Sequence, residues 1–178
     1  MTSRPITEDE FDDLLRSFSR SAFRLETRES YALGYKRDEF DRFLAGTPTP
    51  PTLVDWWKPW LEQITRLTGE GKTVSRVRVL DSPVSEYQRW EAWGSRWNMK
   101  AGEQVSYLPR AFAERLNLPL DHDWWLLDGK RVILMWFTGD GEIDHKILTD
   151  DPDTVTRYLK WWDLAVRNAT AAEDYAAA

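Results

Sequence analysis

The feature that most constrains the fold is a strand, a helix and a second strand in direct succession. Residues 73–80 (TVSRVRVL) alternate charged and apolar side chains, as a strand with one polar and one apolar face does. Ser82 is the predicted N-cap of a helix over 83–97, with Pro83 in its first turn. Residues 104–108 form the next strand. Two strands joined by a helix form a parallel pair, so the chain must build a sheet with helices packed on it.

A hairpin and a closing helix follow this unit. Asp128-Gly129-Lys130 separates two apolar stretches, which is a strong signal of a β-hairpin. The elements predicted after residue 108 are a short helix over 109–116, strands over 124–127, 132–137 and 142–148, and a helix that begins at Asp151-Pro152. This order of elements predicts an α+β fold with a mixed sheet and helices on both faces.

The first 70 residues are predicted to be mainly helical. Thr7–Glu10 is a capping box before an amphipathic helix, and Pro59 indicates that a helix over 53–67 starts late or is kinked. A strand over 21–28 and a short helix over 37–45 lie between them. We expect one domain over 1–178, with an N-terminal helical addition (1–70), a mixed-sheet part (71–168) and a frayed tail (169–178).

Composition excludes several classes of site. The chain has 178 residues, a formal net charge of −6, no cysteine and two histidines, His122 and His145. Disulfides, thiolate catalysis and cysteine-bound zinc are therefore excluded, and we expect no metal site and no cofactor. The negative charge disfavours direct nucleic acid binding. Without a signal peptide or a bilayer-length apolar run, we expect a cytoplasmic protein that does not bind membranes.

Charged and aromatic side chains around the strand at 73–80 form the candidate ligand site. Arg76 and Arg78 share one face near the end of this strand, where ligands of mixed sheets bind, and arginine pairs well with a carboxylate or phosphate. The predicted ligand-binding residues are Arg76, Arg78, Tyr87, Trp90 and Glu26. The alternative interpretation is a structural salt-bridge ladder that joins the two arginines to Glu26, Glu91 or Glu103.

Glu103 and Glu91 are the catalytic candidates if the chain is an enzyme, because a carboxylate with a raised pKa can act as acid or base. A right-handed crossover places the helix over 83–97 back on the sheet. We therefore predict that Arg76, Arg78, Tyr87, Glu91 and Glu103 surround one common space.

The sequence contains 11 tryptophans. Most are expected in the core, with two or three lining a cavity or a partner surface. Trp124 and Trp125 must point to opposite faces of their strand, so we expect one in the core and the other more exposed.

Several segments together carry a family resemblance. They are Phe23–Glu26 with Tyr31, Arg76–Val79, Pro83, Tyr87, Gly102-Glu103 and Asp123–Asp128 before an apolar strand. Over nearly its whole length the chain resembles an uncharacterised domain of actinobacteria, known as a domain of unknown function. Members are typically encoded close to helix-turn-helix regulators and small partner proteins, so the resemblance implies a regulatory or accessory role.

The second half of the chain, with its aromatic-rich closing helix, also resembles a single phospholipase D-like repeat. Catalysis in that superfamily needs a nucleophilic histidine with a lysine two positions further on. Here Ile147 stands two positions after His145, and Trp124 stands two positions after His122. The resemblance therefore implies the fold without that phosphodiesterase chemistry.

Two functions remain open from the sequence. The first is a non-catalytic regulatory or accessory protein that binds a protein partner, such as a helix-turn-helix regulator, or a small ligand. The second is a small cofactor-independent enzyme of specialised metabolism that uses Glu91 or Glu103 on an anionic substrate held by Arg76 and Arg78. An exposed aromatic patch would also suit a homodimer.

Overall fold

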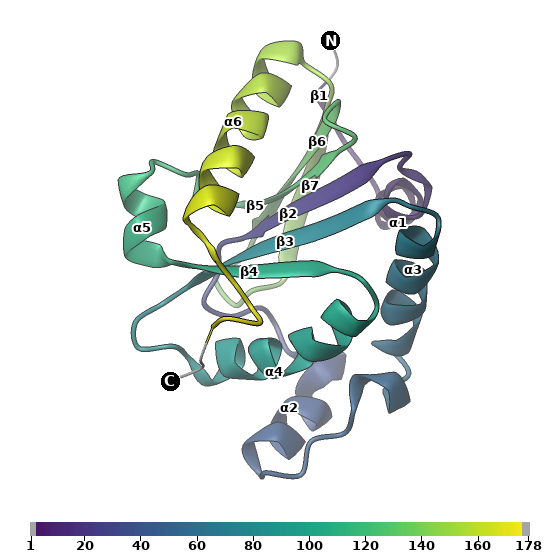
Figure 1. Ribbon diagram of the computed structural model, residues 1–178, viewed down its shortest axis with the longest axis vertical. Coiled ribbons are helices and arrows are strands. Elements are labelled where there is room, and N and C mark those ends of the chain that lie inside the picture. The colour runs from purple at the N-terminus through teal and green to yellow at the C-terminus, as the bar shows by residue number, and fades with distance from the viewer. Residues whose placement is uncertain (1–2, 176–178) are drawn as a thin grey trace.

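A computed structural model describes residues 3–175, and an eight-stranded mixed sheet lies at its centre (Figure 1). The strands are β1 (Ser3–Pro5), β2 (Ser21–Glu26), β3 (Thr73–Leu80), β4 (Gln104–Pro109), β5 (Asp123–Leu127), β6 (Arg131–Phe137), β7 (Ile143–Thr149) and β8 (Thr170–Ala171). Their order across the sheet is β1-β7-β6-β5-β2-β3-β4-β8. Strands β2, β3 and β4 are parallel, and the other neighbouring pairs are antiparallel.

This arrangement confirms the predicted α+β class with a mixed sheet flanked by helices. The structure adds one point about the N-terminal part of the chain. Strand β2 lies between β5 and β3, so residues 1–70 contribute a central strand as well as helices. The parallel pairing sets Arg24 beside Arg76, and Glu26 beside Arg78.

Helices cover both faces of the sheet, as Figure 1 shows. They are α1 (Glu8–Ser17), α2 (Arg37–Leu44), α3 (Lys58–Gly69), α4 (Glu86–Lys100), α5 (Arg110–Arg115) and α6 (Pro152–Asn168), with short 3-10 turns η1 (Gly34–Lys36) and η2 (Pro51–Leu53). One apolar core joins α5 and α6 to the sheet, and a second joins α1 and α3 to the opposite face. A third, aromatic cluster joins α2 to α4. None of the helices described is long and apolar enough to cross a membrane.

One helix begins later than the sequence predicts, and the predicted late start of another is confirmed. Helix α4 starts after Ser85, whose side chain accepts from the Gln88 backbone N–H while the Gln88 side chain accepts from the Ser85 backbone. This reciprocal capping box satisfies two free helix-end groups, which makes Ser85 the N-cap in place of Ser82. Helix α3 starts at Lys58, with Pro59 in its first turn, where the missing N–H costs nothing.

The tail and the Trp124–Trp125 pair also differ from expectation. Instead of fraying from residue 169, β8 pairs with β4, and the Tyr175 ring lies 4.9 Å from the Tyr107 ring. The rest of the predicted tail, 176–178, lies outside the described residues. Trp124 and Trp125 do point to opposite faces, yet neither is exposed, because helices cover both faces of β5.

Candidate functional site

A cavity of about 630 Å³ lies on the sheet face that α1, α3 and α4 cover. Its floor is formed by side chains of β2, β3 and β5, and its walls come from α3, α4 and the segment between β2 and α2. The polar lining includes Arg24, Glu26, Lys36, Arg76, Arg78, Glu91 and Asn98, and the aromatic lining includes Tyr31, Trp56, Trp57, Trp60, Tyr87, Trp90, Trp125 and Phe137. The volume is in the range of cavities that hold small organic ligands.

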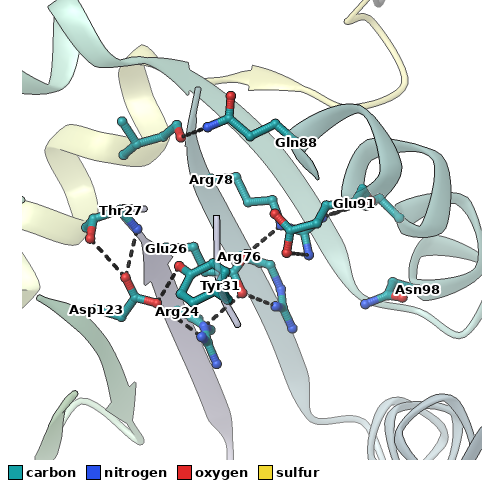
Figure 2. Close-up of polar contacts among 12 residues, drawn as sticks. Arg24, Glu26, Thr27, Tyr31, Arg76, Arg78, Gln88, Glu91, Asn98 and Asp123 are labelled. Atoms are coloured by element: carbon teal, nitrogen blue, oxygen red, sulfur yellow. Dashed lines mark hydrogen bonds and ion pairs between the residues drawn. The ribbon is translucent and has the colours of Figure 1, made fainter. Parts of the chain in front are cut away.

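Strand alternation produces the charged floor. On β2 and β3, residues such as Leu25 and Val77 point into the core beneath α6. The residues between them point the opposite way, which places Arg24 and Glu26 of one strand beside Arg76 and Arg78 of the other. Figure 2 shows these four side chains on the neighbouring strands.

Glu26 is the centre of a buried ion-pair network. Arg76 Nη1 donates to Glu26 Oε1 at 2.5 Å, and Arg78 Nε donates to Glu26 Oε2 at 2.5 Å. Arg24 Nε lies 3.0 Å from Glu26 Oε1. Burial raises the pKa of Glu26, but the three guanidinium groups outweigh it, so the pKa lies well below its ordinary value. Glu26 is therefore ionised throughout the physiological pH range.

Asp123 anchors the β2 end of the floor. Arg24 Nη2 donates to Asp123 Oδ2 at 3.1 Å, and the Tyr31 hydroxyl donates to the same oxygen at 2.6 Å. The other oxygen, Oδ1, accepts from the backbone N–H and hydroxyl of Thr27 at 2.8 and 2.9 Å. Burial raises the pKa of Asp123, opposed chiefly by Arg24. This network holds Tyr31, and with it the segment after β2, over the floor (Figure 2).

Glu103 supports the other end of the floor from beneath. Arg76 Nε donates to Glu103 Oε1 at 2.8 Å, and Asn98 Nδ2 donates to Glu103 Oε2 at 2.5 Å. Glu103 itself is 3% exposed and does not line the cavity. Its carboxylate therefore holds Arg76 in place rather than facing a ligand.

Glu91 differs from the other carboxylates because its side chain has a weaker ion pair. Arg78 Nη2 lies 3.5 Å from Glu91 Oε1, while Arg78 Nη1 donates to the Glu91 backbone carbonyl at 3.0 Å and to Ser95 Oγ at 2.6 Å. Burial raises the pKa of Glu91 to about 7, with Arg78 opposing the shift and Glu26 adding to it. Glu91 can therefore take up or release a proton beside the cavity near neutral pH.

The walls are built from packed aromatic rings. Trp56 and Trp57 stack at 4.9 Å between ring centroids, and the Trp57 ring lies 5.6 Å from that of Trp90. Gly94 of α4 permits this approach, because a Cβ there would lie 2.4 Å from Trp57 Cη2. Lys36 extends its ammonium group to 5.8 Å from the Trp56 ring centroid, and burial lowers the pKa of Lys36.

Several donors at the cavity have no hydrogen-bond partner within residues 3–175. On the floor these are Nη1 of Arg24, Nη2 of Arg76 and the buried Nε of Arg24. In the lining aromatics, the buried indole N–H groups of Trp90 and Trp125 likewise lack an acceptor. One buried acceptor of the lining, Asn98 Oδ1, also lacks a partner, but the unpaired donors outnumber it. Buried polar groups are normally paired, so this surplus of donors favours a ligand that carries acceptors.

The structure brings together nearly all the residues singled out from the sequence. The predicted residues that line the cavity are Arg76, Arg78, Tyr87, Trp90, Glu26 and Glu91. Glu103 is buried beneath the cavity. The predicted salt-bridge ladder is also present, since both arginines pair with carboxylates from this set. Sequence reasoning did not assign Arg24, Asp123, Tyr31 and Lys36 to the site, although the first three lie in segments that carry the family resemblance. The alternation of Arg24 and Glu26 in SAFRLETR could have indicated Arg24, whereas the other three have no local signal.

Comparison with known proteins identifies the family. The family model described as domain of unknown function DUF6879 matches residues 9–177. The chain belongs to this family. No curated protein matches the sequence.

Solved structures of the phospholipase D family share the fold. NucT from Helicobacter pylori is 14% identical at a TM-score of 0.54, and the match covers 96% of this chain and 97% of that one. Nuc from Salmonella typhimurium, a phospholipase D family member, is 11% identical at a TM-score of 0.55, with the same coverage. At this identity the likeness concerns the fold alone.

The two histidines of the DUF6879 chain lie outside the cavity. His122 and His145 stack on Trp136, with ring centroids 5.1 and 4.7 Å away, and neither histidine lines the cavity. His122 Nε2 is hydrogen-bonded to the Tyr158 hydroxyl of α6 at 2.7 Å, on the sheet face opposite the cavity. No group of three or more His, Asp or Glu side chains within residues 3–175 is placed to hold a metal ion.

Proposed function

We propose that this DUF6879 protein is a non-catalytic ligand-binding module with a regulatory or accessory role, and that its ligand occupies the cavity over β2 and β3. The observation that carries this proposal is the combination of a rigid charged floor and aromatic walls around about 630 Å³ of space. Ligand sites in proteins commonly combine such an apolar wall with a few fixed polar groups.

The state of the carboxylates supports a binding role over a catalytic one. Glu26, Asp123 and Glu103 each accept hydrogen bonds from two or more side chains of the network. Carboxylates held in this way are fixed in position, which suits them to orienting the arginines. They are poorly suited to exchanging protons with a substrate.

A thermal-shift screen of small molecules tests the binding role. A ligand at a hundred times its Kd should stabilise the full chain by about 2.7 kcal/mol. Trp56→Ala, which removes a wall of the cavity, should abolish the shift. Trp161→Ala, on α6 behind the opposite sheet face, is the matched control and should retain it. A ligand that stabilises both variants equally would place the binding site elsewhere.

The regulatory part of the proposal implies a protein partner, such as a helix-turn-helix regulator. Support comes from the family resemblance and from the exposed apolar side chains of Tyr35, which lines the cavity, and Leu53, each 72% exposed. Co-purification from the native host, with and without a ligand found by the screen, is the measurement. Recovery of the chain alone and as a monomer under both conditions would contradict a regulatory role.

One observation favours the second candidate, a small cofactor-independent enzyme. Glu91 lines the cavity with a pKa of about 7, which suits a general acid or base at neutral pH. Incubating each bound ligand with the protein and analysing it by mass spectrometry separates the two functions. A binding module returns the ligand unchanged, whereas an enzyme converts it and loses this activity in Glu91→Gln.

A further inference from the structure

The two arginines that carry unpaired donors are neighbours on the floor. Arg24 and Arg76 are register partners on neighbouring parallel strands, and both approach the same carboxylate oxygen, Glu26 Oε1, at 3.0 and 2.5 Å. The Trp125 ring lies beneath both guanidinium groups, at 5.2 Å from Arg24 Cζ and 5.9 Å from Arg76 Cζ. Each guanidinium has one terminal nitrogen without a hydrogen bond, and both arginines line the cavity.

The charge balance around this pair leaves room for a single negative charge. The groups in or beside the floor network are the cations Arg24, Arg76, Arg78 and Lys36, and the carboxylates Glu26, Asp123, Glu103 and Glu91. Glu8 and Glu142 also line the cavity, but both are exposed, and solvent screens their charges. Glu91 is the carboxylate with the longest ion pair of this set. When Glu91 carries a proton, the cations exceed the carboxylates by one. A monoanion would restore neutrality in a site where an uncompensated charge is costly.

The walls next to the two arginines accept a flat ring. Trp60 lies 6.0 Å from Arg76 Cζ and meets Trp125 edge to face at 6.1 Å, and the stacked Trp56–Trp57 pair continues the same wall. Aromatic rings bury large areas against one another in offset or edge-to-face arrangements. The apolar part of a ligand anchored on the arginines would therefore contact indole rings.

We propose that the ligand is a planar aromatic carboxylate, bound with its two oxygens on Arg24 Nη1 and Arg76 Nη2 and its ring against the tryptophan wall. This inference rests on the proposed ligand-binding function and names its ligand class. Two adjacent donors match the two oxygens of a carboxylate, and a single charge matches the balance of the site better than a phosphate dianion does. Lys36 lies at the cavity edge and adds attraction for the anion.

Isothermal titration of the full chain with paired probes tests the ligand class. The probes are benzoate, 2-naphthoate and indole-2-carboxylate, each compared with its own neutral carboxamide and with cyclohexanecarboxylate. At least one aromatic acid should bind about tenfold or more tightly than its amide, because charge-assisted hydrogen bonds are roughly twice as strong as neutral ones. The same acid should bind more tightly than cyclohexanecarboxylate, which has no aromatic ring to stack.

Single substitutions test whether the aromatic acid binds on the floor of the cavity. Arg24→Gln should reduce the affinity for the aromatic acid to that for its amide, and Lys36→Gln should weaken the acid less and leave the amide unchanged. Arg89→Gln, an exposed arginine of α4 outside the cavity, is the matched control and should change neither affinity. If Arg24→Gln does not fold, the comparison of acid and amide on the unmodified chain still decides the proposal.

The outcomes separate this inference from the function on which it rests. Equal or tighter binding of the amides would overturn the anionic class, and equal binding of cyclohexanecarboxylate would overturn the aromatic one. If no acid binds while neutral or cationic compounds stabilise the chain through the cavity, the ligand class is wrong and the binding function stands. If no compound of any charge stabilises the chain, both proposals fail.

Discussion

At the scale of single residues, Glu26 has the greatest influence on the floor. Its two oxygens contact three guanidinium groups, and the residue is 5% exposed. Buried ion pairs of this kind add little net stability compared with an apolar core, but removing one partner leaves charges unpaired in a medium of low dielectric constant. The network therefore fixes the positions of the arginines more than it strengthens the fold.

The first prediction is that Glu26→Gln destabilises the protein by about 3–5 kcal/mol, because three buried guanidinium groups lose a shared carboxylate. Urea denaturation of the variant and the unmodified chain measures the difference. Glu70→Gln is the matched control, since Glu70 pairs with Arg66 and Lys72 on the surface. Its loss should leave the stability close to that of the unmodified chain, because exposed ion pairs contribute little. Equal losses in the two variants would contradict the central role of Glu26.

The second prediction concerns pH and Glu91. The folded chain holds the Glu91 proton up to a pKa of about 7, whereas an unperturbed glutamate loses it near 4.5. The folded state therefore binds more protons between these values, so stability falls as the pH rises from about 4.5 to 7. Glu91→Gln lacks this contribution, and its melting temperature should fall less between pH 5 and 7.5. Glu86→Gln, exposed on the same helix, should follow the unmodified chain, and parallel curves for all three proteins would refute the assignment.

At the scale of elements, the sequence predicts what local patterns determine. Alternation along TVSRVRVL placed Arg76 and Arg78 on one face of a strand, and the crossover brought Tyr87 and Glu91 of α4 over them. Strand pairing is not local. Strand β2 inserts between β3 and β5 through contacts between residues that are about 50 and 100 positions apart in the chain. This insertion brings Arg24 beside Arg76 and places Asp123 within reach of Arg24. Tyr31 is fixed by that same long-range contact with Asp123.

The start of α4 gives the third prediction. Ser85 caps the helix and its hydroxyl also donates to the Glu29 carbonyl at 3.2 Å, which ties α4 to the segment that covers the floor. Ser85→Ala should therefore cost about 1 kcal/mol in chemical denaturation, the usual value for a lost N-cap. Ser82→Ala, at the position favoured by the sequence, should change stability by no more than about 0.5 kcal/mol. A larger loss of stability in Ser82→Ala than in Ser85→Ala would instead identify Ser82 as the N-cap.

At the scale of the whole molecule, short strands end the sheet at both edges. The edge strand β1 has three residues, including Pro5, and β8 has two. Short edges and edge prolines limit the pairing of a sheet with other chains. After β8 and a turn, the ring of Tyr175 packs on Tyr107 of β4. The segment after α6 therefore covers an edge that would otherwise present the backbone of β4.

This closure gives the last prediction. The Ala172 backbone N–H donates to the Val105 carbonyl of β4 at 2.9 Å, and a proline at 172 removes that donor. Ala172→Pro should cost about 1 kcal/mol, the typical net value of a hydrogen bond. With the edge of β4 uncovered, the variant should also associate as concentration rises, as size-exclusion chromatography with light scattering would detect. Ala172→Ser keeps the N–H and should behave like the unmodified chain. An Ala172→Pro protein with unchanged stability and no added association would show that β8 does not protect this edge.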